Sequence, residues 1–196
     1  MLTFEPEGHV YRWDGAVVPS VTQVLDIFHS FDHVDPMVLE AARNFGTHVH
    51  LATQLYDEGR LDEDALDPAL VPYLNGWKKF LSESGFVITA IEEKVYHKRL
   101  RYAGTLDRRG LWRSSSWLLD IKSGAVPFTV GAQTAAYREA MDEKPKRRLC
   151  VQLMPNDYRI SELKELSDFA LFQSALNVFN YFRKHKRNPA NVPVHA

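Results

Sequence analysis

A short apolar strand that carries two charged side chains is the feature that most constrains this chain. The segment Trp117-Leu118-Leu119-Asp120-Ile121-Lys122 is apolar apart from Asp120 and Lys122. Because side chains two residues apart on a strand share a face, Asp120 and Lys122 point to one side. Leu119 and Ile121 then point to the other side, into a core. An ordinary exposed ion pair is the alternative interpretation, but such pairs belong on alternating strands. The segment therefore predicts a polar site on a buried strand.

Asp107, on the preceding predicted strand, joins this pair only if the connecting loop has the right length. The polar turn 113–116 separates the two strands. A two-residue loop at 114–115 sets Asp107 opposite Lys122, and directly opposed residues share a sheet face. A three-residue loop would place Asp107 on the other face. In the first case the carboxylates can hold a divalent cation through oxygen. The neighbouring ammonium can orient or deprotonate a water, or stabilise developing negative charge.

Local signals predict helices and strands in alternation. Asp14-Gly15 between two apolar runs indicates a hairpin. Ser20 with Gln23 forms a capping box, and Asp35-Pro36 begins a second helix. The predicted elements are a hairpin over 9–19, helices beginning at Ser20, over 35–57 and over 68–84, strands over 86–95, 102–112 and 117–122, a helix over 130–141, strands over 148–155 and 158–160 around Asn156-Asp157, and a helix over 167–185. This order predicts an α/β fold, a central mixed sheet flanked by helices.

Length and composition limit the class of protein. The 196 residues predict a single domain over 1–196, with an N-terminal hairpin and helices (1–85), a core (86–185) and a tail (186–196). The 24 Lys and Arg against 25 Asp and Glu exclude a strongly basic surface overall. The single cysteine, Cys150, excludes a disulfide framework and a cysteine-ligated zinc or iron–sulfur site. No apolar stretch approaches the roughly 18 residues that span a bilayer, and the acidic N-terminus carries no targeting signature. We therefore expect a cytoplasmic protein without membrane contact.

Several motifs in a fixed order resemble a known superfamily. They are Gly46-x-x-x-His50 on a predicted helix, Glu92-x-x-Val95 on a predicted strand, Gly104-x-x-Asp107, Asp120-Ile121-Lys122-Ser123-Gly124 and Gln133-x-x-x-Tyr137. Glu93 competes with Glu92 for the place of the upstream carboxylate. The set resembles the PD-(D/E)XK nuclease superfamily, in particular its RecB-type exonuclease branch, which includes the mitochondrial genome maintenance exonuclease and phage recombination exonucleases. The resemblance implies a restriction-endonuclease-like core.

The resemblance also implies a role for each matching residue. The ligands of Mg²⁺ or Mn²⁺ would be His50, Asp107, Asp120 and the backbone carbonyl of Ile121. Lys122 would activate the attacking water, and the catalytic carboxylates would be Glu92, Asp107 and Asp120. Gln133 and Tyr137 are one helical turn apart and so lie on one face, where they would contact the substrate or brace the site.

The implied activity is hydrolysis of phosphodiester bonds in DNA. The enzyme would be an exonuclease rather than a restriction-type endonuclease, acting in recombination, repair or phage DNA processing. Its partner would be DNA, single-stranded or at duplex ends, with no small-molecule cofactor. Two other classes are open: a catalytically silent nucleic-acid-binding or regulatory protein on the same fold, and a metal-dependent hydrolase of small phosphoesters. No Gly-x-x-x-x-Gly-Lys-Ser/Thr motif occurs, which excludes a P-loop motor.

Basic residues gather in three stretches of the chain. Seven lie between 94 and 113, where Asp107 is the only acidic residue. The other two clusters are Lys144, Lys146, Arg147 and Arg148, and Arg183, Lys184, Lys186 and Arg187. Basic groups beside an acidic site suit a phosphate backbone, so we expect Arg108 and Lys98 to contact the substrate. Solvated surface is the alternative. Four aromatic residues either stack on bases or pack in the core, which is the favoured interpretation: Tyr96, Tyr102, Trp112 and Trp117.

Overall fold

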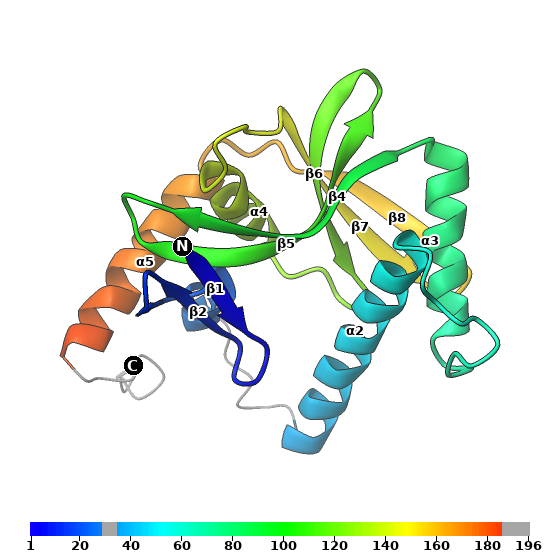
Figure 1. The fold of residues 1–196 in the computed structure, drawn as a ribbon, viewed down its shortest axis with the longest axis horizontal. Coiled ribbons are helices and arrows are strands. Elements are labelled where there is room, and N and C mark those ends of the chain that lie inside the picture. Colours follow the sequence, from blue (N-terminus) through cyan, green and yellow to red (C-terminus); the bar gives the residue numbers. More distant parts are fainter. Residues whose placement is uncertain (29–34, 186–196) are drawn as a thin grey trace, which may run out of the picture.

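A five-stranded mixed sheet forms the centre of the computed structural model, which describes residues 1–28 and 35–185 (Figure 1). The strands lie in the order β4 (Val87–His97), β5 (Tyr102–Trp112), β6 (Ser115–Lys122), β7 (Arg147–Met154) and β8 (Asp157–Glu162). Neighbours are antiparallel except for β6 and β7, which are parallel. The predicted tail 186–196, with Lys186 and Arg187 of the third basic cluster, lies outside the described residues.

Helices cover both faces of this sheet, as the order of elements predicts. They are α1 (Val21–Leu25), α2 (Pro36–Asp57), α3 (Val71–Ser84), α4 (Val130–Glu139) and α5 (Asp168–Lys184). Figure 1 shows α2 and α3 on one side of the sheet and α4 and α5 on the other. Leu119 and Ile121 pack with the α2 and α3 side, whereas Leu118 packs with α1, α4 and α5. Both faces of β6 are therefore apolar, and Asp120 lies at the end of a core layer.

A separate three-stranded antiparallel sheet precedes these elements. Its strands are β1 (Leu2–Glu5), β2 (Val10–Trp13) and β3 (Ala16–Val18), in that order. The predicted hairpin is confirmed, while β1 was not predicted. The Trp13 ring stacks on that of Tyr96 with their centroids 4.2 Å apart. The amide of Ala103 donates to the carbonyl of Pro19 at 2.9 Å. These contacts fix the small sheet against the end of β4 and the start of β5.

The helix signals of the sequence are confirmed, and two turns need correction by one residue. Ser20 and Gln23 make both hydrogen bonds of the capping box, and the Asp35 carboxylate caps α2. The β5–β6 turn consists of 113–114, not 114–115, because Trp112 pairs with Ser115. The β7–β8 turn is likewise 155–156. Both turns still contain two residues, so side chains of the paired strands keep the predicted faces.

The four candidate base-stacking aromatic residues belong to the protein core. Tyr96, Tyr102, Trp112 and Trp117 are all buried. The indole of Trp117 donates to the carbonyl of Trp112, and the Tyr102 hydroxyl donates to the carbonyl of Ala136. The polar atoms of Tyr102 and Trp117 are thus satisfied inside the protein. Core packing is the correct interpretation for all four residues.

None of the helices in the described part of the chain combines the length and the apolar composition that are needed to cross a bilayer.

The contact between α3 and the β7–β8 turn yields a stability prediction. A Cβ on Gly76 would press on the carbonyl oxygen of Asp157 and lie 2.9 Å from that of Met154. We expect Gly76→Ala to lower the free energy of unfolding by about 1–3 kcal/mol, despite the gain of about 1 kcal/mol that alanine brings to a helix interior. Urea denaturation measures this. Gly124→Ala, which meets nothing within 4 Å, is the control; equal stabilities of the two variants would contradict the prediction.

Candidate functional site

A cleft of about 760 Å³ lies between the small sheet, α2, α4 and the strands β4, β5 and β6. Its centre is polar. The side chains of Glu92, Asp107 and Lys122 line it from the three strands, His50 lines it from α2, and Gln133 lines it from α4. These residues lie far apart in the sequence, and the structure brings them together as the motifs predict.

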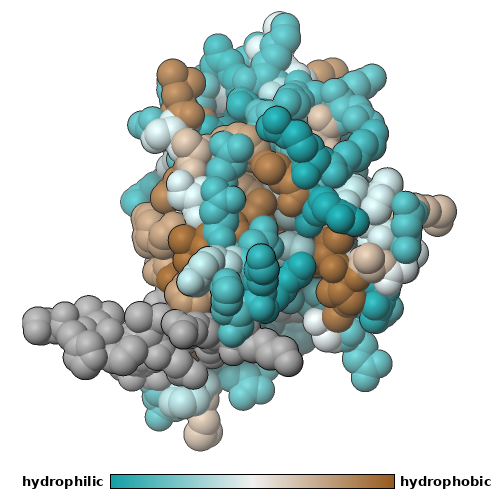
Figure 2. Space-filling view, turned by 90° about the vertical axis from the view of Figure 1, so that its left-hand side faces the viewer, coloured by the Kyte–Doolittle hydropathy of each residue, from teal (hydrophilic) through white to brown (hydrophobic). Residues whose placement is uncertain are grey.

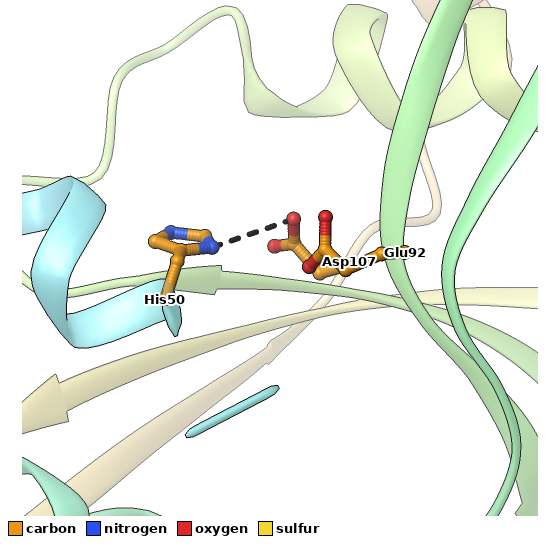
Figure 3. Close-up of side chains that lie close together, drawn as sticks. All are labelled: His50, Glu92 and Asp107. Atoms are coloured by element: carbon orange, nitrogen blue, oxygen red, sulfur yellow. Dashed lines mark ion pairs between the residues drawn. The ribbon is translucent and has the colours of Figure 1, made fainter. Parts of the chain in front are cut away.

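Three side chains in this cleft could hold a metal ion. Ligand atoms of His50, Glu92 and Asp107 all lie within 4.8 Å of one another. Figure 3 shows the two carboxylates side by side, with the imidazole facing Asp107. The distance between Nδ1 of His50 and Oδ1 of Asp107 is 3.5 Å. Carboxylate oxygens suit hard divalent cations, and an imidazole extends the choice to transition metals.

The structure brings Glu92, not Glu93, into this cluster. Glu93 lies by Arg109, with 3.2 Å between Oε2 and Nε. Glu92 has a φ of 49°, in the left-handed region that non-glycine residues rarely adopt. Such a backbone costs about 1–3 kcal/mol and persists only where the surroundings hold it. Here Nη1 of Arg108 holds the Glu92 carboxylate at 3.2 Å.

Asp107 is fixed by a gap in the sheet. The β5–β6 ladder ends at the pair Arg108–Leu119. Beyond it, Oδ2 of Asp107 accepts a hydrogen bond from the amide of Ile121 at 2.6 Å. The same register would place Asp107 opposite Asp120 rather than Lys122, which corrects the predicted pairing but keeps the predicted face. The Asp107 side chain thus takes the place of a backbone acceptor for the Ile121 amide, next to the other carboxylates of the site. The role of the Ile121 carbonyl stays a prediction.

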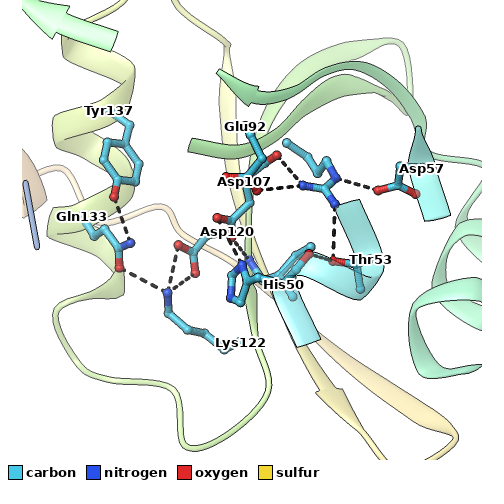
Figure 4. Close-up of polar contacts among 11 residues, drawn as sticks. His50, Thr53, Asp57, Glu92, Asp107, Asp120, Lys122, Gln133 and Tyr137 are labelled. Atoms are coloured by element: carbon cyan, nitrogen blue, oxygen red, sulfur yellow. Dashed lines mark hydrogen bonds and ion pairs between the residues drawn. The ribbon is translucent and has the colours of Figure 1, made fainter. Parts of the chain in front are cut away.

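Asp120, Lys122, Gln133 and Tyr137 form a chain of polar contacts along the other side of the cleft (Figure 4). Nζ of Lys122 lies 3.0 Å from Oδ1 of Asp120 and donates to Oε1 of Gln133 at 3.3 Å. Nε2 of Gln133 donates to the Tyr137 hydroxyl at 3.3 Å. Lys122 and Asp120 therefore share a face, as predicted, and so do Gln133 and Tyr137.

Tyr137 explains the glycine of the Gly104-x-x-Asp107 motif. A Cβ on Gly104 would overlap the Tyr137 ring, whose Cδ1 would be 3.0 Å away. Tyr137 is itself buried. The ring therefore packs directly on the backbone of β5, and its hydroxyl holds the amide of Gln133. At Gly46, by contrast, a Cβ would make only an ordinary contact of 3.6 Å with Ser123.

The electrostatics of the site are those of crowded carboxylates. Burial and then the nearby Asp107 charge raise the pKa of Glu92 to about 7. Burial also raises the pKa of Asp120, although Lys122 opposes this. Burial would raise the pKa of Asp107 too, but His50 and Lys122 outweigh it, and that pKa is lowered. Environments that drive the pKa values of neighbouring carboxyls apart are typical of functional sites.

The pKa values of the two basic groups of the site are raised. Burial alone would lower the pKa of Lys122, but Asp120 and Asp107 outweigh it, so the pKa is raised. The pKa of His50 is raised as well, because the charge of Asp107 outweighs the effect of burial. Lys122 is therefore an ammonium ion, which can donate hydrogen bonds and stabilise negative charge.

Arg108 supports the site from inside the protein. It is fully buried, with Nε 2.6 Å from Oδ2 of Asp57. Its Nη1 donates to the carbonyl of Asp107 at 2.7 Å, and its Nη2 donates to the Thr53 hydroxyl at 3.3 Å. A buried guanidinium cannot touch DNA, so the expected substrate contact of Arg108 is wrong. Instead it ties the end of α2 to Glu92 and to β5.

Sequence reasoning missed Thr53 and Asp57, although one signal for them exists. They follow His50 by three and seven residues, so all three lie on one face of α2. The carboxylate of Asp57 also accepts a hydrogen bond from the indole of Trp77 at 2.9 Å. Lys98, expected to contact substrate, is not among the residues that line the cleft. It is exposed in the β4–β5 turn, where Nζ lies 3.6 Å from Asp142.

Comparisons with known proteins do not assign this chain to a family. No protein-family model matches the chain, and no curated protein matches it. Among solved structures it is similar to LHK-Exo in complex with dAMP, at 11% identity over 86% of this chain and 89% of that chain, with a TM-score of 0.49. The alkaline exonuclease LHK-Exo from Laribacter hongkongensis gives 12% identity over the same shares and a TM-score of 0.47. SSO0001 gives 12% identity over 70% and 72% of the two chains and a TM-score of 0.36. At these levels neither a family nor an activity transfers to this chain.

The burial of Arg108 yields the next prediction. We expect Arg108→Ala to lower the free energy of unfolding by about 3–5 kcal/mol, because it leaves Asp57 buried without its cation. Arg109→Ala is a matched control, since Arg109 is the adjacent residue and its partner Glu93 is partly exposed. The control should cost below about 1 kcal/mol. Thermal and urea denaturation measure both; similar losses in the two variants would show that Arg108 is not a structural cation.

Glu92 yields a prediction about pH. Its pKa rises from the ordinary value of 4.5 to about 7, so between these values the folded chain keeps a proton that the unfolded chain releases. Stability therefore falls as pH rises through this window. In EDTA, we expect Glu92→Gln to be more stable than the natural chain at pH 8, by up to about 3 kcal/mol. At pH 4 the gain should vanish. Glu93→Gln should stay within about 0.5 kcal/mol at both pH values; a gain from Glu92→Gln that is independent of pH would refute the prediction.

Proposed function

We propose that this chain is a metal-dependent nuclease that hydrolyses phosphodiester bonds in DNA. One observation carries the proposal: His50, Glu92 and Asp107 converge from α2, β4 and β5 on one point of the cleft, beside Lys122. Motifs that are far apart in the sequence thus meet as a metal-ligand set next to a cation. The order of these motifs, which resembles that of PD-(D/E)XK nucleases, supports the same function.

The residues present fit a divalent cation. Burial and then the charge of Asp107 raise the pKa of Glu92 to about 7, so a cation beside this carboxylate would be favourable. Oδ2 of Asp120 is buried and accepts no hydrogen bond within the described residues, although Nζ of Lys122 lies 2.8 Å away. We infer that His50, Glu92, Asp107 and Asp120 hold Mg²⁺ or Mn²⁺, with the Ile121 carbonyl as a further oxygen donor. When bound, such a cation favours loss of a proton from water and neutralises charge on the reacting phosphate.

Lys122 supplies a fixed positive charge in this proposal. Its raised pKa keeps the side chain protonated, so it has no lone pair with which to take a proton from water. It donates hydrogen bonds instead, either to the attacking water or to a phosphate oxygen that gains charge in the transition state. Asp120 and Gln133 aim the ammonium, and Tyr137 holds the amide of Gln133 in the orientation that accepts from Lys122.

Exonuclease action is the finer form of the proposal. The resemblance to the RecB-type branch supports it, with DNA ends, single-stranded or duplex, as substrate. The wider setting in recombination, repair or phage DNA processing has the same support. The cleft offers a substrate strand side chains from both walls, including His9 just before β2 and Thr47 from α2.

Cleavage assays test the proposal. We expect the chain to degrade DNA with Mg²⁺ or Mn²⁺ and not with EDTA, and linear DNA in preference to circular DNA. Lys122→Met and Asp107→Asn should each lower the rate by a factor of about 10² or more. Lys164→Met, which removes an exposed lysine paired with Glu162, should leave the rate unchanged. Full activity in EDTA or in Asp107→Asn would overturn the proposal.

Metal binding provides a second readout that does not depend on turnover. Mn²⁺ titration followed by electron paramagnetic resonance should show a site in the natural chain that Asp107→Asn weakens. Asp157→Asn, which removes an exposed carboxylate paired with Lys79, should bind as the natural chain does. Binding of DNA and Mn²⁺ without cleavage would identify a catalytically silent binding protein. Cleavage of nitrophenyl phosphate but not of DNA would identify a hydrolase of small phosphoesters.

A further inference from the structure

A second cavity, of about 390 Å³, lies on the other side of the connection between β3 and α1. Its lining comes from residues 16–19, from the β4–β5 turn at residues 99–101, and from Asn180 and Arg183 near the end of α5. The cavity borders the catalytic cleft at this connection, because Pro19 lines the cavity whereas Ser20 lines the cleft. Figure 2 views the molecule from the side on which the β4–β5 turn and α5 lie, where strongly hydrophilic side chains stand between apolar patches.

The charge of this cavity is positive and uncompensated. Arg99, Arg101 and Arg183 line it, and its lining contains no carboxylate. Within residues 1–28 and 35–185, the structure gives none of these three side chains an ion pair or a hydrogen bond. Other arginines of the surface are paired, such as Arg12 with Glu5 and Arg147 with Glu162. The three guanidinium groups are therefore available to an anion.

The fold assembles this arginine pocket from two separate basic clusters of the sequence. Arg99 and Arg101 come from the first cluster and Arg183 from the third, more than eighty residues later. The β4–β5 turn is tight, since Arg101 has a φ of 56° and its amide donates to the carbonyl of His97 at 2.7 Å. Guanidinium groups bind phosphate oxygens through paired hydrogen bonds, which makes arginine suited to phosphate recognition.

We propose that the arginine pocket binds a backbone phosphate of the DNA whose scissile bond lies in the cleft. The inference rests on the proposed nuclease function and extends it to the path of the substrate. Strand β5 joins the two sites, because Arg101 precedes it and Asp107 lies six residues further on. At about 3.3 Å per residue the separation is about 20 Å, which equals the axial rise of about six base pairs of B-form DNA.

A polymeric anion such as a DNA strand fits these observations better than a small free anion such as phosphate. The three arginines are exposed, and the cavity adjoins the cleft at Pro19 and Ser20, so a polymer that follows this surface would extend from one site to the other. A phosphate at this distance contributes affinity and orientation but does not take part in the reaction. The pocket thus favours substrates that are long enough to span both sites.

The triple variant Arg99→Gln/Arg101→Gln/Arg183→Gln tests the proposal. In EDTA, by fluorescence anisotropy, we expect its affinity for a 20-base-pair duplex to fall by a factor of about ten or more, and the slope of log K against log salt to decrease by about 1 or more. Hydrolysis of thymidine 5′-(p-nitrophenyl phosphate), which cannot reach the pocket, should stay as in the natural chain. The control Arg60→Gln/Arg159→Gln/Lys164→Gln removes the same charge from other surfaces and should bind the duplex as the natural chain does.

Further measurements separate the possible outcomes. The variant with all three arginines changed to lysine keeps the charge and loses the paired hydrogen bonds, and it should bind with intermediate affinity; equal unfolding temperatures exclude misfolding. Equal duplex affinity in the arginine-to-glutamine variant and its control would overturn the proposal. So would calorimetric binding of inorganic phosphate to the pocket without any loss of duplex affinity, since this would identify a site for a free anion. Arginine-dependent DNA binding by a natural chain that does not cleave DNA would instead refute the proposed nuclease function alone.

Discussion

Crowding of carboxylates in a buried place is the constraint on which the rest of this structure depends. Glu92 and Asp107, from the middle of β4 and β5, meet Asp120 near the end of β6. Asp57 lies behind them on α2. Burial of several like charges is costly unless cations and hydrogen bonds compensate them. Lys122 compensates on the cleft side and Arg108 on the inner side. The two cations thereby divide the site into an accessible half and a sealed half.

The sheet is irregular at two places next to this cluster of carboxylates. The ladder between β5 and β6 ends at Arg108, the residue next to Asp107. The amide of Ile121 then donates its hydrogen bond to the carboxylate of Asp107 and not to a backbone carbonyl of β5. On the other side, Glu92 adopts a left-handed backbone between two regularly paired residues of β4. Local strain of this kind persists only where neighbouring contacts hold it. The site is therefore a property of three strands together, and no single motif contains it.

The dependence of the site on contacts between distant strands explains which features of the fold and the site the sequence could predict. Caps and faces depend on neighbours in the chain, so α2, the capping box of Ser20 and the shared face of Asp120 and Lys122 follow from local patterns. The β5–β6 turn was misplaced by one residue because Arg113 and Ser114, both with positive φ, carry none of the Gly or Asn signals of such turns. A basic cluster along the chain does not show which of its residues are buried, and alternation along β5 buries Arg108 and leaves Arg109 near the surface. Asp57, the partner of Arg108, is a long-range contact that no local pattern reveals.

The choice of a charged support behind the cleft has a physical reason. An apolar residue of similar volume in place of a buried ion pair is often neutral or stabilising for a fold, so stability alone does not require Arg108. An apolar residue, however, could not hold Glu92 in its strained backbone or bind the carbonyl of Asp107, the hydroxyl of Thr53 and the carboxylate of Asp57 at once. Partners behind a metal site orient its ligands and tune their affinity. The buried arginine therefore fixes the geometry of the carboxylates at some cost in stability. It also links α2, which carries His50, to Glu92 on the opposite side of the cluster.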